Sequence, residues 1–473
     1  MMRLRPAVPI AIVSLAAGLI LTGCIKYKAR PLNATVVEHQ YRARSIDSAG
    51  IQKFVQSLGW KQWPPAILDL NALTAIAAYY STDLDIARTQ IAIADAGVRT
   101  ANVRINPSLN ADGGYYGEPG AHPLYDISPG FTIETAGKRG YRTLQAEKNA
   151  DAARLSFAEA QWLLWSKVRL ALLDHVLSER RLSLLDREAD LRTQLNEMLE
   201  KRLQVGAVSQ PNVDIYRVEL LKAEAAAETA KGDAAQKRIA LATVVGIPPE
   251  AIASRTIQYR NLDAPPAEIS LSLRKVRKAG LIHRIDVRRT LVDYAAADAA
   301  LKLEIARQYP DIQLAPGYGF QEGFVSYTFS SVVNSLPVFN RNKGPIAAAE
   351  ARRQQVEVRF RALQSQAIGE MGKALALYRS AFNAWQIESK RLKEIEQDRE
   401  QAARRALQAG QGDRFTLVLA QIETNTAALG QLNGLTQVQT SLGALEDSVQ
   451  QPLEAGMGVP EAPEMNPRQE VTQ

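Results

Sequence analysis

The same pattern of apolar and polar positions occurs twice along the chain, and matching positions of the two copies are about 203 residues apart. In each copy a helical pattern ends at a proline, two short segments with alternating apolar and polar positions follow, and a very long helical pattern then begins. The first helical pattern ends at Asn106-Pro107 and the second at Tyr309-Pro310. A repeat on this scale predicts a fold built from two copies of one unit.

The long helical patterns predict one antiparallel helical hairpin in each copy. The first hairpin comprises residues 138–205 and 209–245, and the second comprises residues 344–409 and 413–449. At about 1.5 Å per residue, the longer helix of each hairpin would be about 100 Å long, which is more than a globular core needs. The strand segments are therefore expected at one end of the hairpins and the helical turns at the other.

The alternating segments predict a strand hairpin in each copy, at about 108–134 and about 311–334. Strands of roughly ten residues with an apolar, aromatic-bearing face and a polar face are typical of a wall between lipid and water. An ordinary half-buried sheet would show a similar alternation. The residues expected to face lipid are Tyr125, Phe131, Tyr318, Phe320, Tyr327 and Phe329.

Four strands are too few to close a barrel, and open strand edges are not tolerated in lipid. Two chains would supply eight strands, whose interior is filled by side chains, whereas three chains would supply twelve and leave room for a channel. The predicted fold class is therefore mainly α with a small β part. If the strands form a barrel, we therefore expect a homotrimer with twelve strands.

The N-terminus predicts export and lipid attachment. A cationic start and an apolar run precede Leu21-Thr22-Gly23-Cys24, which predicts a signal peptide over 1–23 and lipidation of Cys24. Cys24 is the only cysteine of the chain, so an internal disulfide is excluded. An uncleaved anchor with an incidental cysteine is the alternative. Ile25 follows Cys24, where an aspartate would be associated with retention at the inner membrane.

Proline, glycine and charge mark the remaining boundaries. Residues 24–65 are expected to form an extended, lipidated tether, because they are mixed in composition and contain three prolines. The repeats are expected over 66–250 and 271–450, with a linker at 251–270. The segment 451–473 is rich in proline, glutamate and glycine, which predicts a disordered tail.

Composition excludes several classes of function. The net charge of +7 is spread over 57 basic and 50 acidic residues without a basic block interleaved with aromatics, so no nucleic-acid partner is expected. The four histidines are isolated, which predicts no metal site. No nucleophile and base occur in a recognisable arrangement, so neither an enzyme nor a cofactor is expected.

The order of helices, strand hairpins and glycine turns resembles the TolC-like family of trimeric outer-membrane efflux ducts. The resemblance extends from about residue 68 to 449 and rests on Arg104-Ile105-Asn106-Pro107, on Tyr309-Pro310 before a Gly-Tyr-Gly stretch, and on the two turns. It implies a twelve-stranded outer-membrane barrel continued by a periplasmic α-helical tunnel. This passive duct would dock onto a periplasmic adaptor protein and through it onto an inner-membrane pump, of the proton-driven RND type.

Two further segments resemble the branch of that family that serves heavy-metal efflux pumps. They are residues 135–140 and 336–344. A multidrug duct or a type I secretion duct of the same family stays open as an alternative. So does a structural coiled-coil lipoprotein of the periplasm, in which the strands would pack as a small sheet.

The resemblance implies roles for the turns between the long helices. In the family such turns contact the adaptor protein. The alternative is that the glycines of the turns only end helices. The turn residues expected to contact the adaptor are Val205, Gly206, Ala207, Val208, Ala409, Gly410, Gln411 and Gly412. Relatives have a charged constriction just beyond the second turn, where this chain has Thr416 and Leu419. The nearby candidates for entrance charges are Asp214, Arg217, Asp413 and Arg414. Solvated charges or salt bridges between helices are the alternative.

Overall fold

The computed structural model describes residues 27–115, 123–267, 273–321, 324–333, 336–389 and 393–453. The chain divides into a small unit that ends at Arg44 and contains α2 (Ala34–Arg42), and a large unit that begins at Ser45. The predicted signal peptide, Cys24 and the predicted tail from residue 454 onward lie outside the described residues.

The large unit is mostly helical with a small antiparallel sheet, which confirms the fold class at this level. Its first half consists of α3 (Ala49–Ser57), β1 (Ile67–Leu68), α4 (Leu70–Tyr80), α5 (Thr82–Asn102), β2 (Ser108–Tyr115), β3 (Pro123–Ile133), α6 (Lys138–Gln204) and α7 (Gln210–Val245). Its second half consists of η1 (Pro249–Ile252), β4 (Thr256–Ile257), α8 (Leu273–His283), α9 (Ile285–Ala306), β5 (Ile312–Gln321), β6 (Phe324–Val333), α10 (Lys343–Ile387), α11 (Lys393–Gln408) and α12 (Arg414–Val449).

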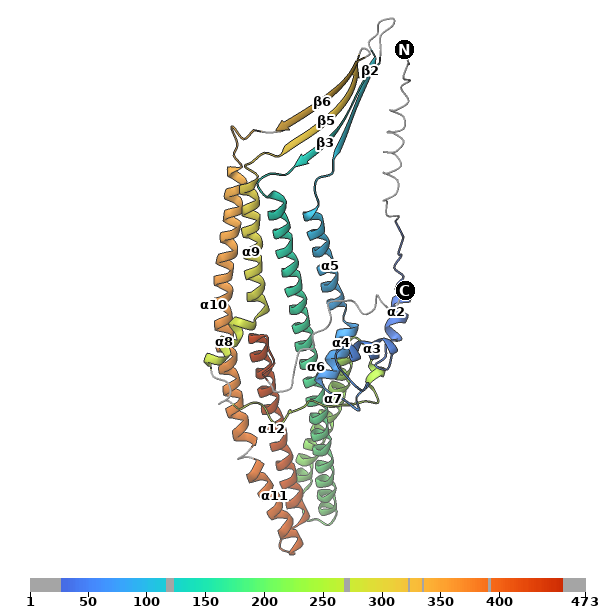
Figure 1. Cartoon of the computed structure of the whole chain (residues 1–473). Coiled ribbons are helices and arrows are strands. Elements are labelled where there is room, and N and C mark those ends of the chain that lie inside the picture. Colours follow the sequence, from blue (N-terminus) through green and yellow to red (C-terminus); the bar gives the residue numbers. More distant parts are fainter. Residues whose placement is uncertain are drawn as a thin grey trace. The chain divides into compact units, whose positions relative to one another are not determined.

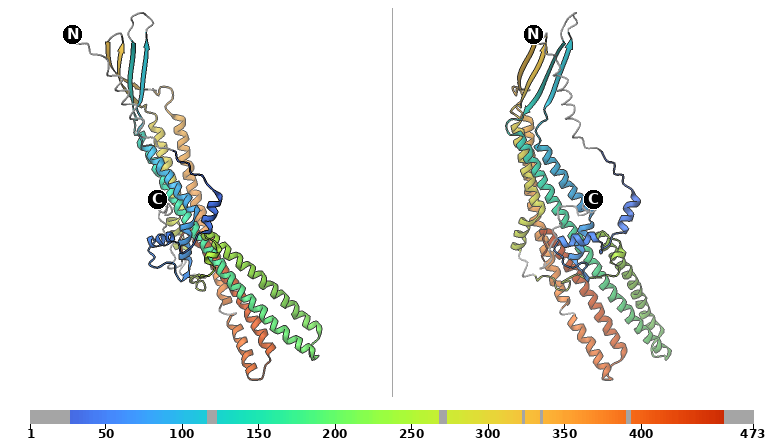
Figure 2. Two further views of the ribbon diagram at one scale, coloured as in Figure 1. Left: turned by 90° about the vertical axis from the view of Figure 1, so that its right-hand side faces the viewer. Right: turned by 45° about the vertical axis from the view of Figure 1, so that its right-hand side comes forward.

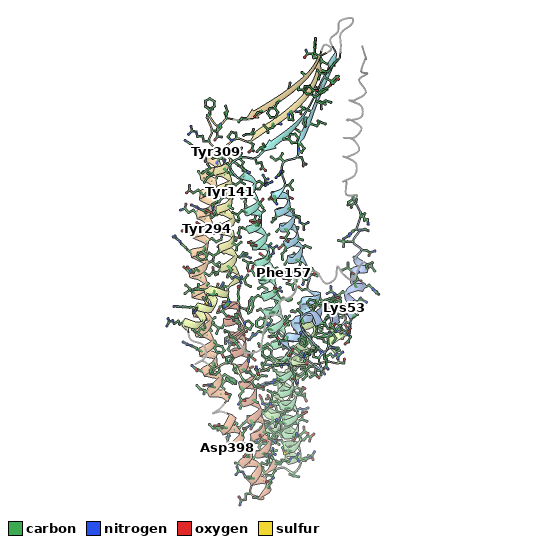
Figure 3. The ribbon with its side chains drawn as sticks, viewed as in Figure 1. Lys53, Tyr141, Phe157, Tyr294, Tyr309 and Asp398 are labelled. Atoms are coloured by element: carbon green, nitrogen blue, oxygen red, sulfur yellow. The ribbon has the colours of Figure 1, made fainter. Side chains whose placement is uncertain are left out.

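Within this unit the four-stranded sheet lies at one end of the helices and the two helical turns lie at the opposite end (Figures 1 and 2). Figure 3 shows the same polarity with side chains: Tyr309 lies beside the sheet and Asp398 lies near the turns. α5, α6, α9 and α10 pack side by side below the sheet, and α6 also packs against α7 and α12. The single helix α6 therefore joins the two repeats over most of its 67 residues.

Left-handed residues set the direction of both long helices where they leave the sheet. α6 follows Ala136 and Gly137, whose φ values are 54° and 74°, and α10 follows Asn342, whose φ is 56°. Asn342 tolerates this conformation because its side-chain amide donates to the Glu304 carbonyl, at 2.8 Å, and to the Glu304 carboxylate, at 2.9 Å. Both helices therefore start at fixed angles to the sheet.

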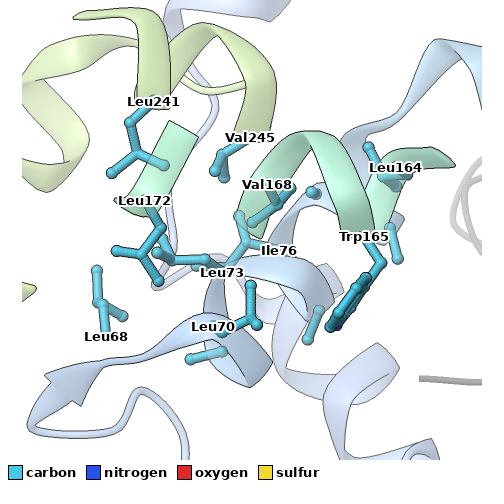
Figure 4. Close-up of a cluster of buried hydrophobic side chains, with 14 of the residues drawn as sticks. Leu68, Leu70, Leu73, Ile76, Leu164, Trp165, Val168, Leu172, Leu241 and Val245 are labelled. Carbon is cyan, nitrogen blue, oxygen red and sulfur yellow. The ribbon is translucent and has the colours of Figure 1, made fainter. Parts of the chain in front are cut away.

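The main hydrophobic core lies midway along the unit, around the short helix α4 (Figure 4). Leu73 and Ile76 of α4 are fully buried against Trp165 and Leu172 of α6. α4 is buried at almost every position, which explains why its sequence is apolar all round rather than on one face. This core holds the middle of the long helices in place.

The prediction of an extended tether over 24–65 is wrong, because α2 lies in its first half and α3 in its second half. α3 packs Ile51, Phe54 and Val55 into the main core, and Ile46 is also buried there. Trp63 donates its indole N–H to the Ile46 carbonyl at 2.7 Å. The amphipathic helix α3 has nine residues and was missed because it is too short to give a clear periodic signal.

The expected linker at 251–270 also contains local structure. β4 pairs in parallel with β1, at Ile67 opposite Thr256 and Leu68 opposite Ile257. Gln258 then donates its backbone N–H to the Leu68 carbonyl. The segment thereby fastens the connection between the repeats to the start of the first repeat.

Within the predicted helix 344–409 the structure describes α10 and α11, and residues 390–392 between them lie outside the described residues, so one continuous helix stays a prediction. After Ile387 the backbone widens into a π-helical turn at Glu388 and Ser389. The Glu388 side chain lies over Gly434 of α12, where a Cβ would be 2.5 Å from a carboxylate oxygen. The equivalent helix of the first repeat, α6, is described without interruption over its 67 residues.

Candidate functional site

The sheet has the strand order β2-β3-β5-β6, with every neighbouring pair antiparallel. Residues that lie directly opposite one another share a face, and the register places all the predicted aromatic positions on the same face. We call this the apolar face. Its pairs include Tyr125 with Phe320, Tyr318 with Tyr327, Phe131 with Leu314, and Pro316 with Phe329.

The aromatic rings of the apolar face contact one another across strands. Tyr125 stacks on Phe320 at a centroid distance of 5.4 Å, and Tyr318 meets Tyr327 edge-on at 5.7 Å. Tyr327 and Phe329 of β6 are nevertheless 84% and 71% exposed. Contiguous exposed apolar side chains of this kind are typical of surfaces that contact a membrane or another protein.

The opposite face of the sheet is polar. Asp112 of β2 lies directly opposite Asp126 of β3, and Asp126 lies opposite Gly319 of β5. Gly319 makes room here, because a Cβ at that position would be 2.7 Å from the Ser326 hydroxyl and 3.2 Å from the Asp126 carboxylate. Within the described residues β2 and β6 each pair on one side only, so the sheet has two free edges.

The two helical turns at the other end of the unit have the same geometry. Gly206 and Gly410 each have a φ of 71°, and a Cβ at either would meet no atom within 4 Å. Their backbone N–H groups donate to the carbonyls of Leu203 and Leu407, which ends α6 and α11. Val205 is 78% exposed beside the first glycine. The glycines therefore end helices and also leave the tips open.

An ion pair connects the two turns. The Arg202 guanidinium lies 2.7 Å from the Asp413 carboxylate, and it also lies over the Phe415 ring at 5.0 Å. Asp413 caps α12 by accepting from the Thr416 backbone N–H, at 2.9 Å, and from the Thr416 hydroxyl, at 2.6 Å. The Thr416 hydroxyl and backbone, together with Arg202, lower the pKa of Asp413 to about 2.

The other charges expected near the entrance are not part of this pair. Asp214 accepts from the Gln210 amide of its own helix at 2.8 Å. Arg217 and Arg414 form no ion pair among the described residues. Arg202, which does join the turns, was missed because it precedes the first turn by several residues and faces a partner from the other repeat. Thr416 donates its backbone N–H and its hydroxyl to Asp413, the residue that caps α12. Leu419 packs against the apolar cluster that joins α6 to α12.

A buried ion pair joins the repeats closer to the main core. Arg169 of α6 and Glu446 of α12 approach to 2.9 Å, and their side chains are only 4% and 1% exposed. Arg169 also donates to the Gln439 carbonyl at 3.0 Å, and the Leu453 backbone N–H donates to Glu446 at 2.9 Å. Gly443 is needed beside this pair, since a Cβ there would lie 2.2 Å from the guanidinium.

Among the residues that the structure describes, no group of three or more histidine, cysteine, aspartate and glutamate side chains is arranged to hold a metal ion. None of the described helices combines the length and the apolar character that crossing a membrane requires. The predicted metal-free, cofactor-free character of the chain stays a prediction.

Comparison with known proteins relates this architecture to outer-membrane channels. The chain matches no family model and no curated protein sequence. Its structure is similar to that of CusC, whose crystal structures concern folding and transmembrane channel formation, with 19% identity, a TM-score of 0.64, and coverage of 83% of this chain and 95% of that one.

Two further solved structures have the same fold. The outer membrane protein VceC from Vibrio cholerae is 18% identical, with a TM-score of 0.63 and coverage of 81% of this chain and 97% of that one. The open state of the Neisseria gonorrhoeae MtrE outer membrane channel is 20% identical, with a TM-score of 0.64 and coverage of 81% and 89%. The resemblance to TolC-like channels is thereby confirmed at the level of the fold.

Proposed function

We propose that this chain, which has the fold of TolC-like channels, is the outer-membrane exit duct of a tripartite efflux system. The observation that carries the proposal is the sheet: it has one exposed aromatic face, one polar face that bears carboxylates, and two free edges. Three copies joined edge to edge would make a twelve-stranded barrel with lipid outside and water inside. Conduction would be passive, with energy supplied by a partner pump.

The helical part supports the same trimeric assembly. α7 packs against α6 and α4, but its side chains Ile215, Val218 and Leu221 are at least half exposed. At the opposite border of the unit, Ile387 and Ile395 are exposed near the junction of α10 and α11. Neighbouring chains in a trimer would bury both borders and close the helices into a tunnel.

The tips are the proposed contact with a periplasmic adaptor. Gly206 and Gly410 leave the backbone accessible, and Val205 offers an exposed apolar side chain beside it. The neighbouring tip residues Ala207, Val208, Ala409, Gln411 and Gly412 complete the proposed surface. Asp214, Arg217, Asp413 and Arg414 are the proposed charges at the entrance, where they would bias which ions pass. Arg202 offsets the charge of Asp413 in this group.

Lipidation at Cys24 and heavy-metal cations as cargo are further parts of the proposal. The first is supported by the sequence Leu21-Thr22-Gly23-Cys24. The second is supported by the resemblance of residues 135–140 and 336–344 to ducts of metal pumps, and drugs are the competing cargo. A susceptibility panel of metal salts and drugs on a deletion strain would separate them, since sensitivity to drugs alone would contradict metal cargo.

A fractionation experiment tests the proposed duct directly. The variant Cys24→Ser removes the predicted acyl chains but leaves the sheet intact. An embedded barrel should stay in the outer-membrane fraction and resist extraction by carbonate, as the wild-type protein should. Release of the variant into the soluble periplasmic fraction would contradict the barrel and favour a structural lipoprotein held only by its lipid. Conductance of the purified protein in planar bilayers provides the second readout.

A further inference from the structure

The junction between the sheet and the long helices has an uneven distribution of charge. Among the described residues, three carboxylates at this junction are each paired within the chain, and each of these side chains is less than a third exposed. The pairs are Glu134 with Arg142 at 2.6 Å, Asp311 with Lys138 at 2.7 Å, and Glu304 with Arg307 at 2.5 Å. The acidic groups at this level are therefore already neutralised.

Four cations at the same junction have no such partner. Arg104 precedes β2, Arg139 lies in the first turn of α6, and Arg341 and Lys343 lie at the start of α10. None of these side chains forms an ion pair or hydrogen bond with the described part of the chain. Arg104, Arg341 and Lys343 are exposed, and Arg139 is half-buried. We call these four residues the basic collar.

The basic collar adjoins apolar surface that continues from the sheet. Arg104 and Arg139 line a cavity of about 450 Å³ together with Phe131 and Ile133, which belong to the apolar face and are 47% and 49% exposed. On the other side, Arg341 follows Phe339, whose side chain is fully exposed. Each pair of cations thus lies beside exposed apolar side chains.

We propose that the basic collar binds the phosphate groups of phospholipids in the inner leaflet of the outer membrane. The proposal rests on the function proposed above, because that function puts the helices in the periplasm and the junction at the inner leaflet. In the cavity, Arg104 and Arg139 would hold the phosphate while an acyl chain lies along Phe131 and Ile133. Guanidinium groups suit this role because their planar donors bind phosphate oxygens in pairs.

Charge complementarity supports a membrane as the partner rather than an acidic protein. The cations lie at the end of a sheet face that is apolar along its length, and the transition from aromatic to cationic side chains is typical of a membrane interface. A cation near an anionic membrane surface contributes favourably to binding even when it contacts no single lipid. The collar would thereby fix how deeply the barrel lies in the membrane.

The test uses the purified full-length protein in detergent with two probes: dioleoylphosphatidylglycerol, which carries a phosphate, and dioleoylglycerol, which has the same acyl chains without it. Native mass spectrometry counts the lipids retained per protein. We expect the wild-type protein to retain the phosphatidylglycerol, and Arg104→Gln/Arg139→Gln to bind it about 30-fold more weakly, because two membrane-facing cations are lost. Dioleoylglycerol should bind weakly to both proteins.

Matched controls separate this effect from a general loss of charge. Arg187→Gln/Arg359→Gln removes two exposed arginines from α6 and α10, away from the junction, and should leave phosphatidylglycerol binding unchanged. An excess of inorganic phosphate should not displace the lipid; displacement would identify a free-phosphate site and overturn the lipid assignment.

Equal retention of the two probes by the wild-type protein, or equal binding by the collar variant and the control variant, would overturn the proposal. The trimer content and bilayer conductance of the same preparations are measured in parallel. A wild-type protein that neither trimerises nor conducts would contradict the proposed duct, whereas a conducting trimer without phosphate preference would contradict only the collar.

Discussion

The buried ion pair between Arg169 and Glu446 should be the most sensitive charged contact between the repeats. In Glu446→Gln the guanidinium stays buried, because its side chain is only 4% exposed, but it loses its counter-charge. Leaving one partner of a buried pair alone costs about 3–5 kcal/mol. We expect the lower end, about 3 kcal/mol, because the Gln439 carbonyl still accepts from Arg169 and a glutamine oxygen can still accept from Leu453.

Hydrogen exchange measured by mass spectrometry shows where in the chain the free energy of opening has decreased. A decrease of about 3 kcal/mol in the free energy of opening raises the exchange rate of the amides near residues 165–172 and 438–449 by roughly 150-fold. Amides close to the turn at Gly206 and Gly410 should keep their wild-type rates, since they lie at the far end of the helices.

The same helix provides the control. Glu423→Gln breaks a pair with Arg399 of similar length, 2.8 Å, but those side chains are 54% and 50% exposed, so the cost should stay below about 1 kcal/mol. Arg169→Met/Glu446→Leu, which removes both charges, should recover most of the protection lost in Glu446→Gln. Equal exchange in the two single variants would refute the reasoning that burial makes the difference.

Three further predictions concern the glycines and the turns. Gly443→Ala places a methyl group against the Arg169 guanidinium and should lower the thermal midpoint of unfolding measured by circular dichroism. Gly430→Ala, in the same helix but with open space around the glycine, should leave the midpoint unchanged or raise it, because alanine in a helix can add up to about 1 kcal/mol to the free energy of unfolding. Because the pKa of Asp413 is lowered, its pairing with Arg202 stabilises the turns above about pH 4 and is lost as the pH falls toward 2. The protection factors of the amides at residues 200–216, which compare the measured exchange rate with the intrinsic rate at each pH, should fall over that range in the wild type and stay constant in Asp413→Asn. Gly206→Trp/Gly410→Trp should abolish efflux while leaving trimers and outer-membrane location intact on electrophoresis and fractionation; loss of trimers would assign these glycines to folding instead.

Most of the fold that could be predicted from the sequence follows from the local periodicity of apolar positions. A helix period that persists from residue 138 to about 205 leaves little alternative to a long helix, and the alternation around Tyr318 and Tyr327 specifies which side chains share a face. The mainly helical class and the small antiparallel sheet follow from these patterns. The TolC-like arrangement followed from the order in which the patterns repeat.

Contacts between distant segments could not be predicted in the same way. Arg169 and Glu446 are ordinary helical charges in the sequence, and only the packing of α6 on α12 buries them together. Arg202 lies before its turn and pairs with Asp413 across the repeats. α3 was missed because a helix of nine residues gives only a short periodic signal, and the close approach of Glu388 to Gly434 depends on the packing of α10 on α12.

The free edges of β2 and β6 have a consequence for inheritance. If three chains close one barrel, a chain whose β6 cannot pair leaves the barrel open in every trimer that contains it. In a cell that makes equal amounts of intact and edge-defective chains, only about one trimer in eight would contain three intact copies. An edge mutation of this protein should therefore be dominant over the wild-type allele, whereas a mutation that prevents export should be recessive.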